Sequence, residues 1–182
     1  MELITPSIKY QESYIAALKE GFYAGSQAIK TDAEIAEIAA DFNKYLATKL
    51  LKPYDATPRL RDDGKYYPNA PQIKFWLVEG DKFIGEFNLR TELNDFLMYV
   101  GGNVGYGIRP SERQKGYATQ GLKLLIEEAR QRGMKKLLIA AKSSNIGSWK
   151  AIEKNDGRLE NTITLPWKKD NEEYKRYWIE IK

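Results

Sequence analysis

Arg113-Gln114-Lys115-Gly116-Tyr117-Ala118-Thr119 is the most informative run of residues in this chain. It follows a short apolar segment, Val104 to Ile108, and leads into an amphipathic stretch whose helix we expect to begin near Ala118. The order strand, basic turn with glycine, helix start is typical of phosphate binding. The free N–H groups of the first helical turn and the helix dipole both favour an anion there. Gly116 lets the backbone approach such a ligand closely.

Composition restricts the chemistry that this chain can perform. Its 182 residues are 42% hydrophobic and 30% charged, which predicts one globular domain spanning 1–182. The sequence contains no cysteine and no histidine, so it cannot form disulfides, thiolate or histidine metal sites, or nucleophilic Ser–His and Cys–His pairs. We therefore expect no metal, and acid–base work must come from Asp, Glu, Tyr, Lys, water or the backbone.

The charge pattern favours a small anionic ligand. The net charge is +4 and the pI is about 9.0, but Lys and Arg are scattered along the chain. The focused group is Arg109, Arg113 and Lys115, which suits a small polyanion better than a long one, so we expect no nucleic-acid partner. Apolar runs are too short for a membrane span and Met1–Ile4 does not resemble a signal peptide, so we expect a cytoplasmic protein with no membrane partner.

The first half of the chain predicts two helices, a long connection and a hairpin. Thr31–Glu34 is a capping box, and the apolar stripe behind it predicts one long helix that reaches Leu50. Leu51–Gln72 holds four of the seven prolines and three tyrosines, which favours either a lid or a well-packed surface loop. Strands at 75–79 and 82–89 should be joined at Gly80-Asp81. In the second strand, alternation places Phe83, Gly85, Phe87 and Leu89 on one face, and Ile84, Glu86, Asn88 and Arg90 on the other.

The second half predicts a helix, a buried strand, a short helix and a final strand pair. Gly133 should end the helix that begins near Ala118, and 136–141 reads as a strand covered on both faces. Asn145 is placed to cap a short helix that ends before Gly157. The element order indicates an α/β chain with a mixed sheet.

The phosphate-loop run matches the pattern [QR]-x-x-G-x-[GA] of the GNAT acetyltransferase superfamily at Arg113, Gly116 and Ala118. Gly105–Ser111 resembles the strand before that loop, and the stretch from Asn145 to Gly157 resembles the family's later helix. The resemblance covers roughly 73–181 and is nearest to a group of uncharacterised predicted bacterial acetyltransferases. It implies a mixed central sheet with helices on both faces and a splay between two parallel strands, 104–109 and 137–142.

The same resemblance implies acetyl-CoA as the acetyl donor and assigns residues to it. The pantetheine would pair with the backbone of Ile108 and Arg109, and the Ile108 N–H would polarise the thioester carbonyl. Asn145 and Ser148 would face the pantetheine and the sulfur. The pyrophosphate would lie on the loop, at Arg113, Gln114, Lys115, Gly116, Tyr117, Ala118 and Thr119.

The implied reaction is direct transfer of the acetyl group to a primary amine in a ternary complex, without a protein nucleophile. The acceptor would be a small molecule or a protein amine, and a homodimer is left open. For the base we favour Glu92, followed by Glu86 and Asp95.

One departure from the family weakens the assignment of the acid. Many members carry a tyrosine seven residues after the position of Asn145, as general acid to the sulfur, and this chain has Ile152. Tyr106, Tyr174, Tyr177 and Ser148 remain alternatives, as does water. The departure also keeps open a non-catalytic acyl-CoA-binding domain.

Overall fold

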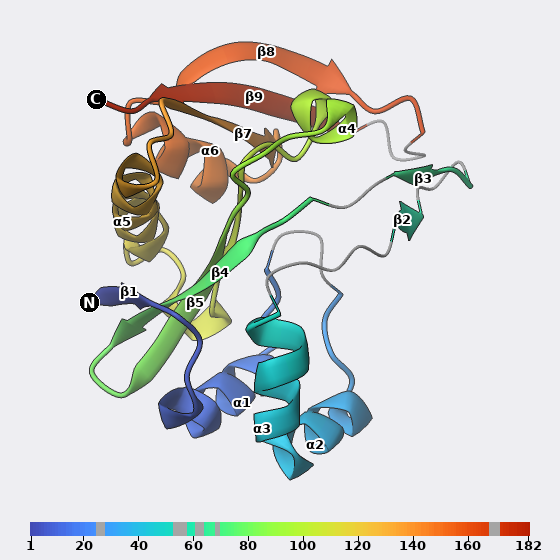
Figure 1. Ribbon diagram of the computed structural model, residues 1–182, viewed down its shortest axis with the longest axis vertical. Coiled ribbons are helices and arrows are strands. Elements are labelled where there is room, and N and C mark those ends of the chain that lie inside the picture. The colour runs from blue at the N-terminus through green and yellow to red at the C-terminus, as the bar shows by residue number, and fades with distance from the viewer. Residues whose placement is uncertain (25–27, 53–57, 61–63, 68–69, 168–171) are drawn as a thin grey trace.

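The computed structural model describes residues 1–24, 28–52, 58–60, 64–67, 70–167 and 172–182. Figure 1 shows the arrangement of its helices and strands. The strands are β1 Glu2–Ile4, β2 Arg59–Leu60, β3 Tyr66–Tyr67, β4 Ile73–Glu79, β5 Lys82–Leu89, β6 Val104–Ile108, β7 Lys136–Lys142, β8 Arg158–Thr164 and β9 Glu173–Glu180. The α-helices are α1 Gln11–Lys19, α2 Asp32–Ala40, α3 Phe42–Tyr45, α4 Asp95–Tyr99, α5 Tyr117–Gln131 and α6 Ile146–Glu153. Short 3₁₀ turns occupy Ile8–Tyr10 and Pro110–Glu112, and a π-helical turn occupies Leu46–Leu50.

Two antiparallel sheets form the frame of the molecule. One has the strand order β1-β4-β5-β6 and the other has the order β7-β9-β8. In Figure 1 the second sheet lies at the top, the helices α1, α2 and α3 lie at the bottom, and α5 and α6 lie along the left. The predicted α/β class with helices on both faces is confirmed, because α5 packs on one face of the β1-β4-β5-β6 sheet and α1, α2 and α3 pack on the other.

The two sheets meet at a narrow seam between their edge strands, β6 and β7. An antiparallel bridge pairs Gly102 with Ile139, and Asn103 N–H donates to the Leu138 carbonyl at 2.7 Å. The Asn103 side chain completes the seam, because its Oδ1 accepts from Leu138 N–H at 2.8 Å and its Nδ2 donates to the Arg90 carbonyl at 2.9 Å. Beyond this point the strands belong to separate sheets, which is the expected splay. No parallel ladder joins them within the described ranges.

The predicted long second helix is interrupted. The capping box of Thr31 and Glu34 is present, but the backbone of Asp41 leaves the helical region with φ −141°. Asp41 then caps α3 by accepting a hydrogen bond from Lys44 N–H at 3.0 Å. The apolar stripe still packs into one cluster with Tyr14 and Trp76, so the break redirects the helix without losing its buried side.

A β-bulge in β5 changes which residues share a face. Leu77 pairs with Gly85 while Val78 pairs with Phe83, which leaves Ile84 as the extra residue. Phe83 therefore packs against the N-terminal helices, and Ile84 packs in the main core with Phe87 and Leu89. The predicted alternation is wrong for Phe83 and Ile84 for this reason.

After the bulge, alternation holds and sets up the site. Glu86 lies opposite Trp76 on β4 and Gly107 on β6, and Asn88 lies opposite Gly105. These side chains are on the face of the sheet that carries the N-terminal helices.

Candidate functional site

A cavity of about 710 Å³ opens between β6, the loop before α5, and α6. Most of the residues predicted to hold the cofactor line it: Ile108, Arg113, Gln114, Gly116, Tyr117, Ala118, Thr119, Asn145 and Ser148. The predicted residues Arg109, Lys115 and Glu92 do not line it. The structure thus brings the two separate sequence segments together across the splay.

The loop backbone at this cavity is shaped for an anion. Gly116 has φ +84° and is the N-cap of α5, and no side chain caps the helix there. A Cβ at Gly116 would have only Gln120 Nε2 nearby, at 3.7 Å. Gln114 also has a positive φ, 63°, a conformation that non-glycine residues adopt mainly where the surrounding structure demands it. Because the first amides of α5 lack a side-chain cap and line the cavity, a pyrophosphate fits here.

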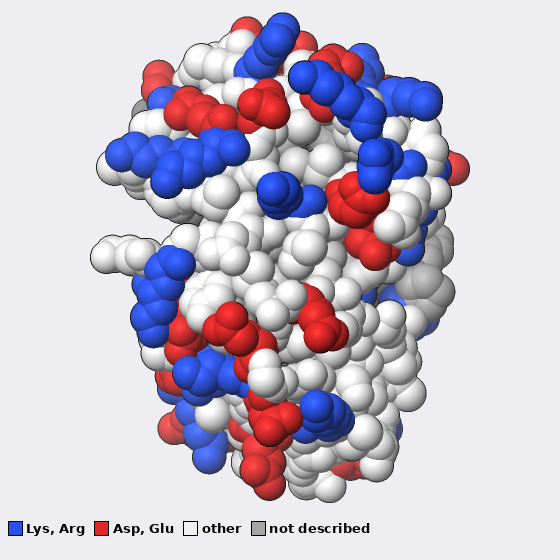
Figure 2. Space-filling view, turned by 90° about the vertical axis from the view of Figure 1, so that its left-hand side faces the viewer, with Lys and Arg blue, Asp and Glu red and all other residues white. Residues whose placement is uncertain are grey.

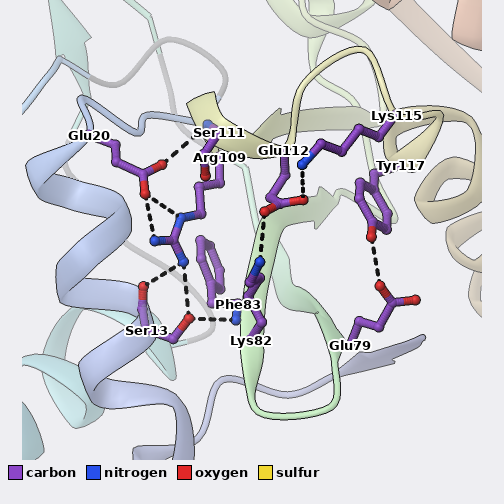
Figure 3. Close-up of polar contacts among 10 residues, drawn as sticks. All are labelled: Ser13, Glu20, Glu79, Lys82, Phe83, Arg109, Ser111, Glu112, Lys115 and Tyr117. Atoms are coloured by element: carbon purple, nitrogen blue, oxygen red, sulfur yellow. Dashed lines mark hydrogen bonds and ion pairs between the residues drawn. The ribbon is translucent and has the colours of Figure 1, made fainter.

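The Arg109 side chain serves the scaffold instead of the cavity (Figure 3). Its guanidinium donates to Glu20 Oε1 from Nη2 at 2.6 Å and from Nε at 2.9 Å, and Nη1 donates to Ser13 Oγ at 3.2 Å. Ser111 N–H adds a contact to Glu20 Oε2 at 3.3 Å. Arg109, followed by Ser111, holds the pKa of Glu20 down to about 2, against the smaller opposing effect of burial. The end of β6 is therefore fastened to α1.

Lys115 is also engaged away from the cavity. Its ammonium and that of Lys82 each lie 2.9 Å from the buried Glu112 carboxylate, and these two hydrogen bonds lower the pKa of Glu112. Figure 3 shows the same loop held from the other side by Tyr117, whose hydroxyl donates to Glu79 Oε2 at 2.6 Å. The expected cluster of three cations is thus not assembled, because Arg109 and Lys115 each have an acidic partner.

Arg113 is the loop cation that reaches the cavity. Its Nε donates to the Ile108 carbonyl at 3.1 Å, and its guanidinium lies 5.9 Å from the ring centre of Tyr23. Tyr23, Ile108 and Arg113 all line the cavity.

The backbone of Ile108 faces the splay, on the edge of β6 away from β5. Arg109 N–H donates to the Ile84 carbonyl at 2.9 Å, and the Arg109 carbonyl accepts from Glu112 N–H at 2.9 Å. Strand backbones alternate, so the neighbouring Ile108 N–H points to the opposite edge, on the side where Arg113 reaches the Ile108 carbonyl. Of the two predicted backbone contacts to pantetheine, Ile108 is the one that the fold leaves facing the cavity.

Ser148 and Tyr106 meet across the cavity. Asn145 caps α6 as predicted, with its Oδ1 accepting from Ser148 N–H at 3.2 Å. The Tyr106 hydroxyl lies 2.9 Å from Ser148 Oγ and donates to the Ser148 carbonyl at 3.0 Å. Burial raises the pKa of Tyr106 to about 12. Both side chains line the cavity, whereas Tyr174 and Tyr177 do not, and Ile152 is fully buried in the main core.

The carboxylates named as bases occupy very different surroundings. Glu92 and Asp95 are exposed after the end of β5. Glu86 is only 1% exposed, and Asn88 Nδ2 donates to its Oε1 at 3.2 Å.

The buried Glu86 face is polar and partly open. Burial raises the pKa of Tyr14 well above its usual value, with Tyr45 and then Glu86 adding to the effect. Asn88 Oδ1 is buried and has no hydrogen-bond partner among the described residues. Beside it, the space that a Cβ of Gly105 would enter is open. This face therefore offers buried acceptor groups next to β6.

The cavity lining also includes residues that the sequence did not single out, among them Tyr23, Lys142, Lys150 and Lys154. The spacing of Lys150 and Lys154 puts them on one face of α6, a signal that helical periodicity could have supplied. Tyr23 carries no such signal, because it reaches the cavity through the packing of the segment after α1.

The surface over α5 and α6 carries charges of both signs. Figure 2 views the molecule from the side on which these helices lie in Figure 1, and basic and acidic side chains intermix there. No group of three or more metal-binding side chains occurs within the described ranges. Across the same part of the chain, none of the helices has the length and apolar character needed to cross a membrane.

Comparisons with known proteins agree with this geometry. A family model described as an acetyltransferase (GNAT) domain matches residues 27–158. No curated protein matches.

Several solved structures share the fold at low sequence identity. An acetyltransferase from Salmonella typhimurium that modifies the N-terminal serine of ribosomal protein L7/L12 aligns with a TM-score of 0.60 and 11% identity, covering 99% of this chain and 94% of that one. A GNAT-family acetyltransferase from Bacillus anthracis aligns with a TM-score of 0.62 and 12% identity, covering 98% of this chain and 93% of that one. A Salmonella typhimurium acetyltransferase with acetyl-CoA bound aligns with a TM-score of 0.55 and 14% identity, covering 100% of this chain and 94% of that one. The chain belongs to the GNAT family of N-acetyltransferases, whose acetyl donor is acetyl-CoA.

Proposed function

We propose that this protein transfers the acetyl group of acetyl-CoA to a primary amine by direct attack in a ternary complex. One observation carries the proposal. The phosphate loop, the Ile108 backbone and Ser148 line one cavity, while Glu86 and Asn88 lie on the opposite face of the adjacent strand pair. A donor on one side and an acceptor on the other would meet at β6, so both substrates can be bound together.

Each part of the donor cavity has a distinct task in this proposal. Bound acetyl-CoA supplies the activated acetyl thioester. The uncapped amides from Gly116 to Thr119 hold the pyrophosphate. The Ile108 N–H donates toward the acetyl carbonyl, where developing negative charge is stabilised. Arg113 has to release the Ile108 carbonyl to let the pantetheine pair there.

Glu86 suits the role of base better than Glu92 does. A general base must lie within hydrogen-bond reach of the amine, directly or through one water. Glu86 lies directly opposite Gly107, one residue before Ile108, whereas Glu92 is exposed after the strand has ended. The unpartnered Asn88 Oδ1 beside it can accept a second hydrogen bond from the same amino group. The amine would approach over Gly105, where there is open space.

Ser148 and Tyr106 take the place left by Ile152. Ser148 Oγ can donate toward the sulfur while Tyr106, held protonated by burial, donates to the Ser148 carbonyl and fixes the serine. Ser148→Ala should lower kcat by roughly 10-fold to 100-fold with coenzyme A affinity within about threefold, by loss of one general acid. An unchanged kcat would assign the proton to water.

The direct test is release of free thiol from acetyl-CoA with a panel of amines that includes alkylamines, polyamines, amino acids and a peptide with a free N-terminus. The proposal expects release that depends on an amine, with intersecting initial-rate lines when both substrates are varied. Parallel lines would indicate a covalent acetyl-enzyme instead. Tight acetyl-CoA binding without amine-dependent release would identify the non-catalytic acyl-CoA-binding domain, the alternative that Ile152 at the family's tyrosine position keeps open.

A further inference from the structure

Two lysines at the C-terminal end of α6 line the cofactor cavity: Lys150 lies within the helix, and Lys154 is its C-cap. Lys150 and Lys154 lie one helical turn apart, beyond Ser148 and on the same wall. From Ser148 to Lys154 the helix axis advances about 9 Å, which carries the lysines away from the pantetheine end. The wall opposite them is the first turn of α5, including Thr119.

The position of this end of α6 is fixed. Asn155 Nδ2 donates to the Thr119 carbonyl at 3.0 Å and to the Ala151 carbonyl at 2.8 Å. One amide group therefore ties the end of α6 to the start of α5. Because the two helices cannot drift apart without losing these bonds, both lysines stay within reach of a ligand held by the loop.

Charges around the lysines leave them available to an anion. Among the described residues, the Lys150 ammonium has only the ring of its neighbour Trp149 as a partner, 5.8 Å from the ring centre, and Lys154 has no ion pair. Glu112 is the acidic residue of the cavity lining, and it is already bound by Lys82 and Lys115. Lys142 lies 2.5 Å from Glu172, and Glu153 accepts from Tyr177 at 2.9 Å. The remaining field at this end of the cavity is positive.

We propose that Lys150 and Lys154 recognise the 3′-phosphate of coenzyme A. The pyrophosphate is provided for by the loop amides and Arg113 on the facing wall. The ribose 3′-phosphate is the one further anionic group of the cofactor. The ammonium groups of Lys150 and Lys154 can both contact this phosphate, because a hydrogen bond fixes the end of α6 that carries them. The proposal concerns the donor alone and stands whether or not an amine is the acceptor.

Calorimetric titration of the whole chain with coenzyme A and with 3′-dephospho-coenzyme A tests this without an acceptor. The wild type should bind coenzyme A at least 10-fold more tightly, a difference of about 1.4 kcal/mol. In the double variant Lys150→Gln/Lys154→Gln the two ligands should bind within about twofold of each other, and the affinity for the dephospho form should barely change. Raising the salt concentration should reduce the wild-type preference as well.

Lys123→Gln is the matched control, because it removes the same charge from an exposed position on α5 outside the cavity. It should keep the wild-type preference. Two results would overturn the proposal. One is a preference that survives in the double variant. The other is an equal loss for both ligands, which would mean that the lysines serve the pyrophosphate or only the general field.

Discussion

Gly116 combines two properties that the cofactor loop needs. Its φ of +84° lies in the left-handed region, and the space beside it is clear of backbone atoms. Gly116→Asp would add strain together with a negative charge facing the pyrophosphate. We expect the affinity for acetyl-CoA to fall at least 10-fold, or about 1.4 kcal/mol, by calorimetric titration.

A matched control separates an effect at the loop from a general loss of stability. Gly133 also has a positive φ, +75°, and follows the end of α5 outside the cavity. Gly133→Asp should lower stability through the same backbone strain and leave acetyl-CoA affinity intact. Equal affinities in both variants would remove the phosphate assignment from this loop.

The two glutamates around β5 make opposite predictions for catalysis. Glu86→Gln keeps the shape of a buried side chain, and it should lower turnover by roughly 100-fold if Glu86 is the general base. Glu92→Gln changes an exposed side chain and should leave turnover within a few-fold of the wild type. Acetyl-CoA affinity should be nearly constant in both, measured separately from steady-state rates. The reverse pattern would restore Glu92, the residue that the sequence analysis favoured.

Short sequence motifs predicted the roles of some site residues, but they could not predict the partners of residues that pair with distant parts of the chain. Gly116 and Asn145 act through neighbours within one helical turn, so a short motif contains all the information they need. Arg109 is 89 residues from Glu20, its acidic partner, and no local pattern reveals that pairing. Lys115 pairs with Glu112 only three residues away, but the second cation on that carboxylate, Lys82, is 30 residues distant and carries no local signal.

At the level of elements, periodicity located the helices and strands but not their irregularities. The stripe from Ile35 to Leu50 has helical spacing throughout, yet Asp41 can satisfy backbone groups outside a helix and does so as the cap of α3. In β5 the bulge at Ile84 reverses the alternation at one step. Asp is compatible with a regular helix and Ile with a regular strand. Packing against two separate hydrophobic cores therefore determines the helix break at Asp41 and the bulge at Ile84.

The segment from 51 to 72 offers a test of element function. Within it, the structure describes the antiparallel strand pair β2–β3, whereas Tyr54, Pro53 and Pro68 lie outside the described residues. None of the described residues of this segment lines the cofactor cavity. Just outside its ends, Lys74 Nζ donates to the Lys49 carbonyl at 2.9 Å, so a shorter connection can close.

Replacing the segment with a short Gly/Ser linker should therefore leave acetyl-CoA affinity unchanged. We expect it to raise KM for the amine, and to raise it most for the best amine of the panel, since tyrosines supply flat contact area at a cleft mouth. Equal increases across the panel, or none, would make the segment a simple connector and leave selectivity to the Glu86 and Asn88 face.

For the whole molecule, element order was enough to predict the architecture, while the way the halves join was not predictable. The seam depends on Asn103, which bonds the backbone of both Arg90 and Leu138 and is 5% exposed. Gly102 beside it has φ +64°, and a Cβ there would lie 2.2 Å from the Leu138 carbonyl oxygen. An Asn after two glycines is an ordinary turn signal in a sequence, so its role in joining two sheets is visible only once β7 is in place.

Asn103→Ala should show what this seam contributes. It leaves the buried Leu138 N–H without a partner, which costs about 1–3 kcal/mol of unfolding free energy, measured by urea denaturation. Asn161→Ala makes the same chemical change at an exposed position on β8 and should cost much less. Because β6 and β7 bound the splay, the Asn103 variant should also bind acetyl-CoA more weakly under conditions where it remains folded. A variant that loses stability but keeps full affinity would mean that the loop and α6 define the cavity without help from the seam.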